Sequence, residues 1–173
     1  MARGRLTGGG SLVLNSQGLS LYLEEDRAVT NMVRSALDRG ADRVVSGATL
    51  IEAQHNGIKR ARWNHVLPQL RVEPLSVGWS KEAALLLRDT GLHGHKYAID
   101  AMVAVTALHQ PGPVVMLTSD TDDMAKLCGE RITLALLRHC ECPAHADGSA
   151  CPNPVPEPGS MSPDSPAARA RRR

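Results

Sequence analysis

The sequence predicts an α/β fold, a single domain in which a parallel sheet of about five strands carries helices on both faces. Short apolar runs of strand length alternate with longer segments whose apolar residues recur at helical spacing, as in strand–helix crossover units. Runs such as residues 114–117 (VVML) are apolar throughout, which is typical of strands buried on both faces. The 173 residues are enough for one such core with chain to spare.

The first part of the chain supplies two strands, each followed by helical segments. The candidate strands are residues 12–14 (LVL) and 43–46 (RVVS). Residues 19–23 and then 28–37 have apolar side chains at helical spacing, and Gly40 ends the second of these segments as a C-terminal cap. After the second strand, residues 49–62 are expected to form one continuous helix.

The later part of the domain supplies three more strands and three more helices. The expected strands are residues 72–75, 114–117 and 132–137, of which the first is interrupted by Pro74. The expected helices run from an N-cap at Ser80 to the glycines 91 and 94, over residues 97–109, and from a cap at Asp120 or Thr121 to Gly129. The domain would then span residues 12–138, between a flexible lead, 1–11, and a Pro-rich tail, 139–173, whose composition predicts disorder.

The composition excludes several classes of function. The chain has no Phe, two Trp and two Tyr, too few aromatics for a base-stacking RNA platform, and its formal net charge is +2. No segment approaches the roughly 20 apolar residues of a membrane span, and the start lacks the apolar core of a signal peptide. We therefore expect a cytoplasmic protein without membrane contact. Arginines at 169 and 171–173 could attract phosphate or form a solvated end.

Polar side chains stand at the edges of four apolar segments. Asn15 follows the first predicted strand, and Asp120 follows the fourth. Glu52 lies in the helix after the second strand, and Asp100 lies early in the helix before the fourth. Because ligands of open parallel sheets bind at the carboxyl ends of the strands, all four could face one crevice, supported by Asp123. Acids brought together in this way would form a site for a hard metal ion.

Simpler interpretations exist for two of these acids. Asp120 could cap the helix that follows it, and Glu52 could be a solvated helix residue. Asp100 is harder to explain in such terms, because it interrupts an apolar helix.

Together these motifs resemble the PIN-domain ribonuclease family, especially the VapC-like toxins of bacterial toxin–antitoxin pairs. The matching stretches are residues 12–16 (LVLNS), 46–52 (SGATLIE), 97–104 (YAIDAMVA) and 117–124 (LTSDTDDM). They cover nearly the whole predicted domain in the family's order. The resemblance implies a Mg²⁺ or Mn²⁺ site, metal-dependent endonucleolytic cleavage of an RNA substrate and a small antitoxin protein as partner. We also expect a homodimer.

Carried over by position, the resemblance implies metal ligation by Asn15, Glu52, Asp100 and Asp120, helped by Asp123. It also implies that Glu52, Asp100 and Asp120 are catalytic. Asn15 departs from the family pattern, because an amide offers an oxygen ligand but no negative charge. We therefore expect weaker metal binding and slower chemistry than four acids would give. The alternative is a catalytically impaired PIN-fold protein that acts as a regulator by binding RNA or a protein.

A second group of candidate residues follows Glu52 at helical spacing. His55, Lys59 and Arg62 would form a basic stripe beside the acids, placed to hold the RNA backbone. The alternative interpretation is a solvated helix face.

A third group follows the last predicted strand. It comprises His139, Cys140, Cys142, His145 and Cys151. Thiolates and imidazoles at this density can bind Zn²⁺, although the C-x-C spacing is less typical than C-x₂-C. The alternative, expected for a reducing compartment, is a set of free thiols in a flexible tail.

Overall fold

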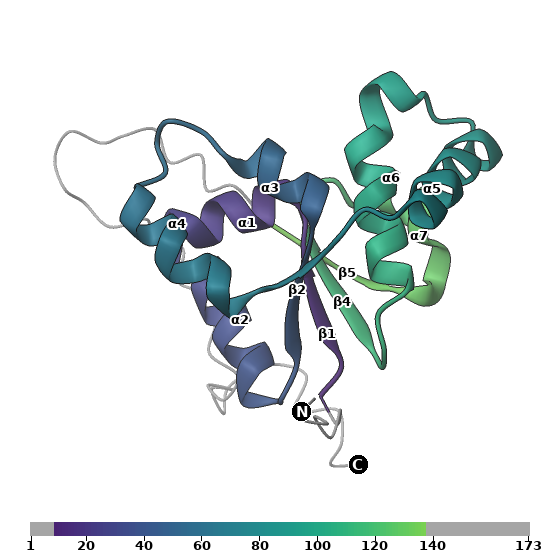
Figure 1. Ribbon diagram of the computed structural model, residues 1–173. Coiled ribbons are helices and arrows are strands. Elements are labelled where there is room, and N and C mark those ends of the chain that lie inside the picture. The colour runs from purple at the N-terminus through teal and green to yellow at the C-terminus, as the bar shows by residue number, and fades with distance from the viewer. Residues whose placement is uncertain (1–8, 138–173) are drawn as a thin grey trace, which may run out of the picture. The chain divides into compact units, whose positions relative to one another are not determined.

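Five parallel strands form one sheet in the order β3-β2-β1-β4-β5 (Figure 1). The computed structural model describes residues 9–137, within the first of two units into which the chain divides, Met1–His139 and Cys140–Arg173. The strands are β1 (Ser11–Leu14), β2 (Asp42–Ser46), β3 (Arg71–Glu73), β4 (Val114–Thr118) and β5 (Thr133–Leu136). The predicted α/β class and five-stranded parallel sheet are confirmed. The predicted tail, with its Cys/His cluster and terminal arginines, lies outside the described residues.

Helices cover both faces of this sheet (Figure 1). They are α1 (Ser16–Leu23), α2 (Arg27–Asp38), α3 (Gly47–Ala53), α4 (Arg60–Val66), α5 (Val77–Thr90), α6 (Gly94–Leu108) and α7 (Thr121–Cys128), with 3₁₀ turns η1 (Leu67–Gln69) and η2 (Gly129–Arg131). Helices α1, α2 and α4 lie on one side of the sheet, and α5, α6 and α7 lie on the other. Within residues 9–137 no helix has the length and apolar character needed to cross a membrane.

The central strand β1 contributes to a hydrophobic core on each face. Leu12 and Leu14 pack with the α1, α2 and α4 side, whereas Val13 packs with the α5, α6 and α7 side. This division follows from strand geometry, because successive side chains point to opposite faces. All three side chains are at most 3% exposed. A strand buried on both faces needs apolar side chains at every position, which explains the apolar run.

The expected single helix over residues 49–62 is wrong. Helix α3 ends at Ala53 and α4 begins at Arg60, with a loop between them. In this loop His55 Nδ1 accepts the Gly57 N–H at 3.1 Å, and the Ile58 N–H donates to the His55 carbonyl at 3.1 Å. The turn buries Ile58, which is 8% exposed, in the core beneath α1 and α4. Burial of this side chain therefore overrides the local helical pattern.

Two predicted helix starts also need correction. Helix α5 begins at Val77, because Ser76 rather than Ser80 is its N-cap and accepts the Trp79 N–H at 3.1 Å. Helix α6 begins at Gly94, a residue expected to end the preceding helix. Gly91 alone ends α5: it adopts φ +69°, and its N–H donates to the Arg88 carbonyl at 3.2 Å.

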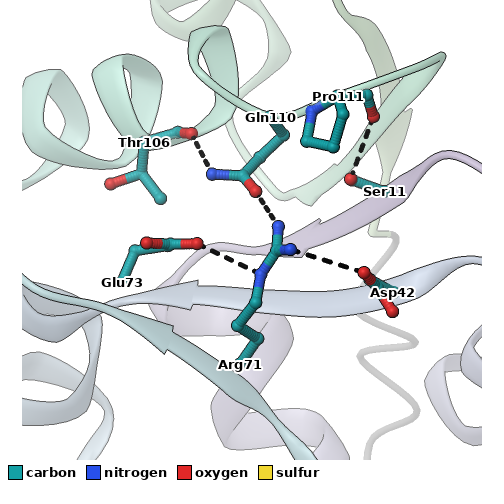
Figure 2. Close-up of polar contacts among 7 residues, drawn as sticks. All are labelled: Ser11, Asp42, Arg71, Glu73, Thr106, Gln110 and Pro111. Atoms are coloured by element: carbon teal, nitrogen blue, oxygen red, sulfur yellow. Dashed lines mark hydrogen bonds and ion pairs between the residues drawn. The ribbon is translucent and has the colours of Figure 1, made fainter. Parts of the chain in front are cut away.

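The edge strand β3 is tied to its surroundings by the Arg71 guanidinium (Figure 2). Its Nε lies 3.1 Å from Glu73 Oε1, and its Nη1 lies 3.4 Å from Asp42 Oδ2 at the start of β2. Its Nη2 donates to Gln110 Oε1, and Gln110 Nε2 donates to the Thr106 carbonyl of α6 at 2.8 Å. One side chain thus links the edge of the sheet to β2 and to the end of α6.

Candidate functional site

Asn15 ends β1 and begins α1, and its amide contacts both neighbouring elements. Its Oδ1 accepts the Gly18 N–H at 2.8 Å, which makes Asn15 the N-cap of α1. Its Nδ2 donates to Thr118 Oγ1 at 3.0 Å, at the end of β4. The Gly18 N–H fixes the orientation of the amide, since only the oxygen can accept it. Asn15 is 8% exposed, so both of its polar ends are satisfied inside the fold.

The Thr118 hydroxyl links Asn15 to the start of the next predicted site segment. Besides the Asn15 amide it accepts the Asp120 N–H at 3.1 Å, and it donates to the Asp120 carbonyl at 3.2 Å. One hydroxyl therefore uses its donor and both acceptor positions. Thr118 is fully buried, so the turn that carries Asp120 is fixed relative to the end of β1.

Glu52 reaches the same edge of the sheet from α3. Its Oε2 accepts a hydrogen bond from the Ser16 hydroxyl, in the first turn of α1. Both helices start at the carboxyl ends of adjacent parallel strands, β1 and β2, so the contact follows from the topology. Glu52 is exposed, and the Ser16 hydroxyl gives this carboxylate a fixed partner on the neighbouring helix.

Asp100 is the acid at the centre of the candidate site. It lies half-buried in the first half of α6. Because the last residues of α6 lead to the start of β4, the first half of this helix lies toward the carboxyl ends of the strands. Burial raises the pKa of the Asp100 carboxyl, and the negative charges of Glu52, Asp120 and Asp123 raise it further. The charges of acids from α3 and the β4–α7 region thus act on Asp100 in α6.

Asp120 and Asp123 are each held by local partners. Asp120 Oδ1 accepts the Asp123 N–H at 3.0 Å, so Asp120 caps α7, one of the two interpretations considered for it. The Asp123 carboxylate lies 2.7 Å from Lys126 Nζ, one turn further along α7. The hydrogen bond from Lys126, together with one from Tyr97, lowers the pKa of Asp123 although its side chain is only 14% exposed.

The donor chemistry of this cluster fits a hard divalent cation. Carboxylate oxygens are the ligands that Mg²⁺ and Mn²⁺ prefer, and the pKa of Asp100 is raised by burial first and by the neighbouring carboxylates second. In the described part of the chain, however, no three His, Cys, Asp or Glu side chains are close enough together to hold a metal ion. The Glu52 carboxylate accepts from the Ser16 hydroxyl, and the Asp120 carboxylate accepts the Asp123 N–H.

The three cations predicted to hold RNA do not form one helical stripe. His55 lies in the loop after α3, 3.0 Å from Glu24. Arg62 in α4 lies 3.5 Å from Glu25 and donates to the Tyr22 carbonyl at 3.3 Å. Lys59 is exposed at the N-cap position of α4. His55 and Arg62 therefore pair with acids that follow α1, which the sequence pattern did not indicate.

Lys96, which the sequence offers with His93 and His95 either as a phosphate contact or as part of a polar loop, lies in α6 next to Tyr97. The Lys96 ammonium donates to the Tyr97 hydroxyl at 2.8 Å, and Tyr97 contributes, after Lys126, to the lowered pKa of Asp123. A usable signal was present: Lys96 precedes Asp100 by four residues, the spacing at which helical side chains share a face.

The fold of this chain is PIN-like, as the sequence resemblance implied. No family model matches the chain, and no curated protein matches its sequence. It is similar to a chain of VapBC2 from Rickettsia felis bound to a DNA fragment from their promoter, with a TM-score of 0.55 and 14% identity over 73% of this chain and 98% of that one. For FitAcB from Neisseria gonorrhoeae the TM-score is 0.46, with 18% identity over 71% and 95% of the two chains. At these identities the VapBC2 likeness establishes the fold alone.

Proposed function

We propose that this chain is a VapC-like metal-dependent endoribonuclease that cleaves RNA phosphodiesters in the cytoplasm. The observation that carries the proposal is the environment of Asp100. This half-buried carboxyl shares its surroundings with Glu52, Asp120 and Asp123 at the carboxyl edge of a PIN-like sheet. Like charges gathered at one place oppose folding, and such an arrangement is typical of a site that binds a cation or performs chemistry.

The roles of the acids follow from how each one is held. Glu52, Asp100 and Asp120 would bind the Mg²⁺ or Mn²⁺ ion through their carboxylate oxygens. When bound, the ion would supply an activated water and positive charge beside the scissile phosphate. Asp100 is carried by α6 and would serve as the fixed ligand. Asp120 would use Oδ2, because Oδ1 caps α7, and Asp123 would support the site through Tyr97 and Lys126.

Asn15 sets the expected strength of the activity. Its Oδ1 already accepts the Gly18 N–H, so it would offer a metal ion one further lone pair and no charge. We therefore propose that metal affinity and cleavage are weaker than an acid at this position would allow. This observation favours the second candidate function, a catalytically impaired PIN-fold protein that regulates by binding RNA or a protein.

The partners of the chain are part of the same proposal. VapBC2 is a complex that was studied on promoter DNA. By analogy of fold we propose that a small antitoxin protein binds this chain, and that the chain forms a homodimer. Light scattering after gel filtration tests the dimer, and co-expression with the product of a short neighbouring open reading frame tests the antitoxin.

The decisive experiment is cleavage of single-stranded RNA by the purified full chain in Mn²⁺. We expect slow cleavage that stops with EDTA and is lost in Asp100→Ala, with Mn²⁺ affinity in calorimetry lowered by the same substitution. Cleavage that persists in Asp100→Ala would show that Asp100 is not required for it. If the chain and Asn15→Asp are both inactive, and Asp100→Ala leaves Mn²⁺ affinity unchanged, the enzyme proposal is rejected.

A further inference from the structure

Lys96 stands beside the acid cluster with a defined position. It is an exposed residue of α6, one helical turn before Asp100. Its Nζ donates to the Tyr97 hydroxyl at 2.8 Å and lies 4.6 Å from the centroid of the Tyr97 ring. The hydrogen bond to the Tyr97 hydroxyl therefore holds the ammonium over the ring of its neighbour in α6, on the helix that carries Asp100.

Lys126 forms an ion pair with a carboxylate, whereas Lys96 forms a hydrogen bond with a neutral side chain. Lys126 Nζ is in direct contact with a carboxylate, Asp123, at 2.7 Å. In residues 9–137 Lys96 contacts the neutral Tyr97 side chain and forms no ion pair, and after Tyr97 the charges of Asp123 and Asp120 also raise the pKa of its ammonium. Its field nevertheless reaches the cluster, since it opposes the rise in the pKa of Asp100. Lys96 is therefore a positioned cation whose ammonium is available for a further anionic partner.

We infer that Lys96 binds a backbone phosphate of the RNA at the acid cluster, with Tyr97 as the residue that positions its ammonium. An acidic site repels a polyanion, so a cation at its edge is needed to hold the strand while the acids and their metal ion act on it. The tyrosine hydroxyl restrains the long side chain without neutralising it, which leaves the full charge for the phosphate. This inference rests on the proposed nuclease function and assigns the substrate contact that it requires.

The test measures RNA binding without cleavage. A fluorescein-labelled, mixed-sequence single-stranded RNA is titrated with the full chain in EDTA, by anisotropy at several salt concentrations. Lys96→Met should weaken binding on the order of tenfold at low salt, the scale of one charge-assisted hydrogen bond. It should also reduce the slope of log affinity against log salt by about 0.7, the value for one phosphate contact on a single strand.

Matched variants separate this contact from general charge loss. Lys96→Arg should retain most of the affinity, and Tyr97→Phe should lose part of it. Lys81→Met removes another exposed lysine, from α5, and should bind like the unaltered chain. All variants keep the same basic tail, and each is first checked by circular dichroism and melting temperature. Equal weakening by Lys96→Met and Lys81→Met, or no weakening by Lys96→Met, would overturn the inference.

Cleavage assays in Mn²⁺ distinguish this inference from the proposed function. For an active chain, Lys96→Met should raise KM and leave kcat nearly unchanged, because a phosphate contact away from the reacting bond binds ground and transition states alike. Lys96-dependent binding in a chain that never cleaves RNA would support the inference and reject the nuclease. Cleavage with an unchanged KM in Lys96→Met would support the nuclease and reject the inference.

Discussion

The Asn15 amide donates a hydrogen bond of 3.0 Å to the Thr118 hydroxyl, which joins the end of β1 to the end of β4 across 103 positions of sequence. A carboxylate at position 15 could cap α1 equally well, but it could not donate this bond. Asn15 therefore combines two effects that oppose each other: it satisfies a buried hydroxyl, and it withholds negative charge from the acid cluster.

Asn15→Asp should separate these two effects. Without metal we expect a lower melting temperature, because the donor to Thr118 is lost and a further negative charge enters the cluster, at a cost on the order of 1 kcal/mol. With Mn²⁺ we expect tighter metal binding and cleavage raised several-fold or more. Differential scanning fluorimetry in EDTA and initial rates in Mn²⁺ measure the two effects. Unchanged melting and unchanged cleavage together would show that position 15 lacks both roles.

Thr118→Val should destabilise the fold at an almost unchanged side-chain volume. The Asn15 amide and the Asp120 N–H would both lose their acceptor, and a buried donor without a partner costs about 1–3 kcal/mol. Urea denaturation measures this loss, and Thr118→Ser, which keeps the hydroxyl, is the matched control. Equal stability of the Val and Ser variants would mean that the hydroxyl is dispensable.

Asp100→Asn should stabilise the metal-free protein at neutral pH. The pKa of Asp100 is raised in the folded state, so its contribution to stability is present below the unfolded pKa, near 4, and is lost as the pH rises. The variant should therefore melt higher than the unaltered chain at pH 7, and the difference should shrink toward pH 4. Asp38→Asn, an exposed acid of α2, is the control.

Addition of Mn²⁺ should reverse this order of stability. A ligand that binds only the folded state raises its stability, and Asp100→Asn should gain less from it than the unaltered chain. A variant that melts lower than the unaltered chain in EDTA would contradict the electrostatic account of Asp100.

Cys128 should be chemically inert in the native protein. It is 1% exposed, and burial raises the pKa of its thiol from 9.0 to about 11. Mass spectrometry after iodoacetamide treatment should find Cys128 unmodified until the chain unfolds. The raised pKa also predicts a stability contribution that is lost as the pH rises from about 9 to about 11. Cys128→Ala should show a shallower fall in unfolding free energy over this range, and identical slopes would refute the assignment.

The sheet can be predicted from the sequence because its inner strands are buried on both faces, which requires apolar side chains throughout. Strands β1 and β4 are buried on both faces, so their apolar runs are unambiguous, and the parallel arrangement then brings Asn15 and Asp120 to one edge. The approach of Glu52 and Asp100 to that edge follows from the same topology. These features depend on the order of elements rather than on side-chain detail.

The remaining features depend on contacts that no local pattern encodes. The break between α3 and α4 comes from burial of Ile58, which lies far from its core neighbours in sequence. The pairing of His55 with Glu24 and of Arg62 with Glu25 follows a turn in which Glu25 adopts φ +66°, a conformation uncommon for this residue type. The effect of Tyr97 on the pKa of Asp123 likewise requires α6 and α7 to pack side by side.

The Arg71 network has a consequence for the order of folding. Its guanidinium joins β3 to residues 42 and 110, so its contacts cannot form until three distant segments have come together. We expect such contacts to contribute late, after a transition state that forms around the central strands. Arg71→Met should therefore accelerate unfolding while the refolding rate changes little, as stopped-flow chevron plots can show. The β3 edge of the sheet would then slow unfolding of the native state without being a site where folding begins.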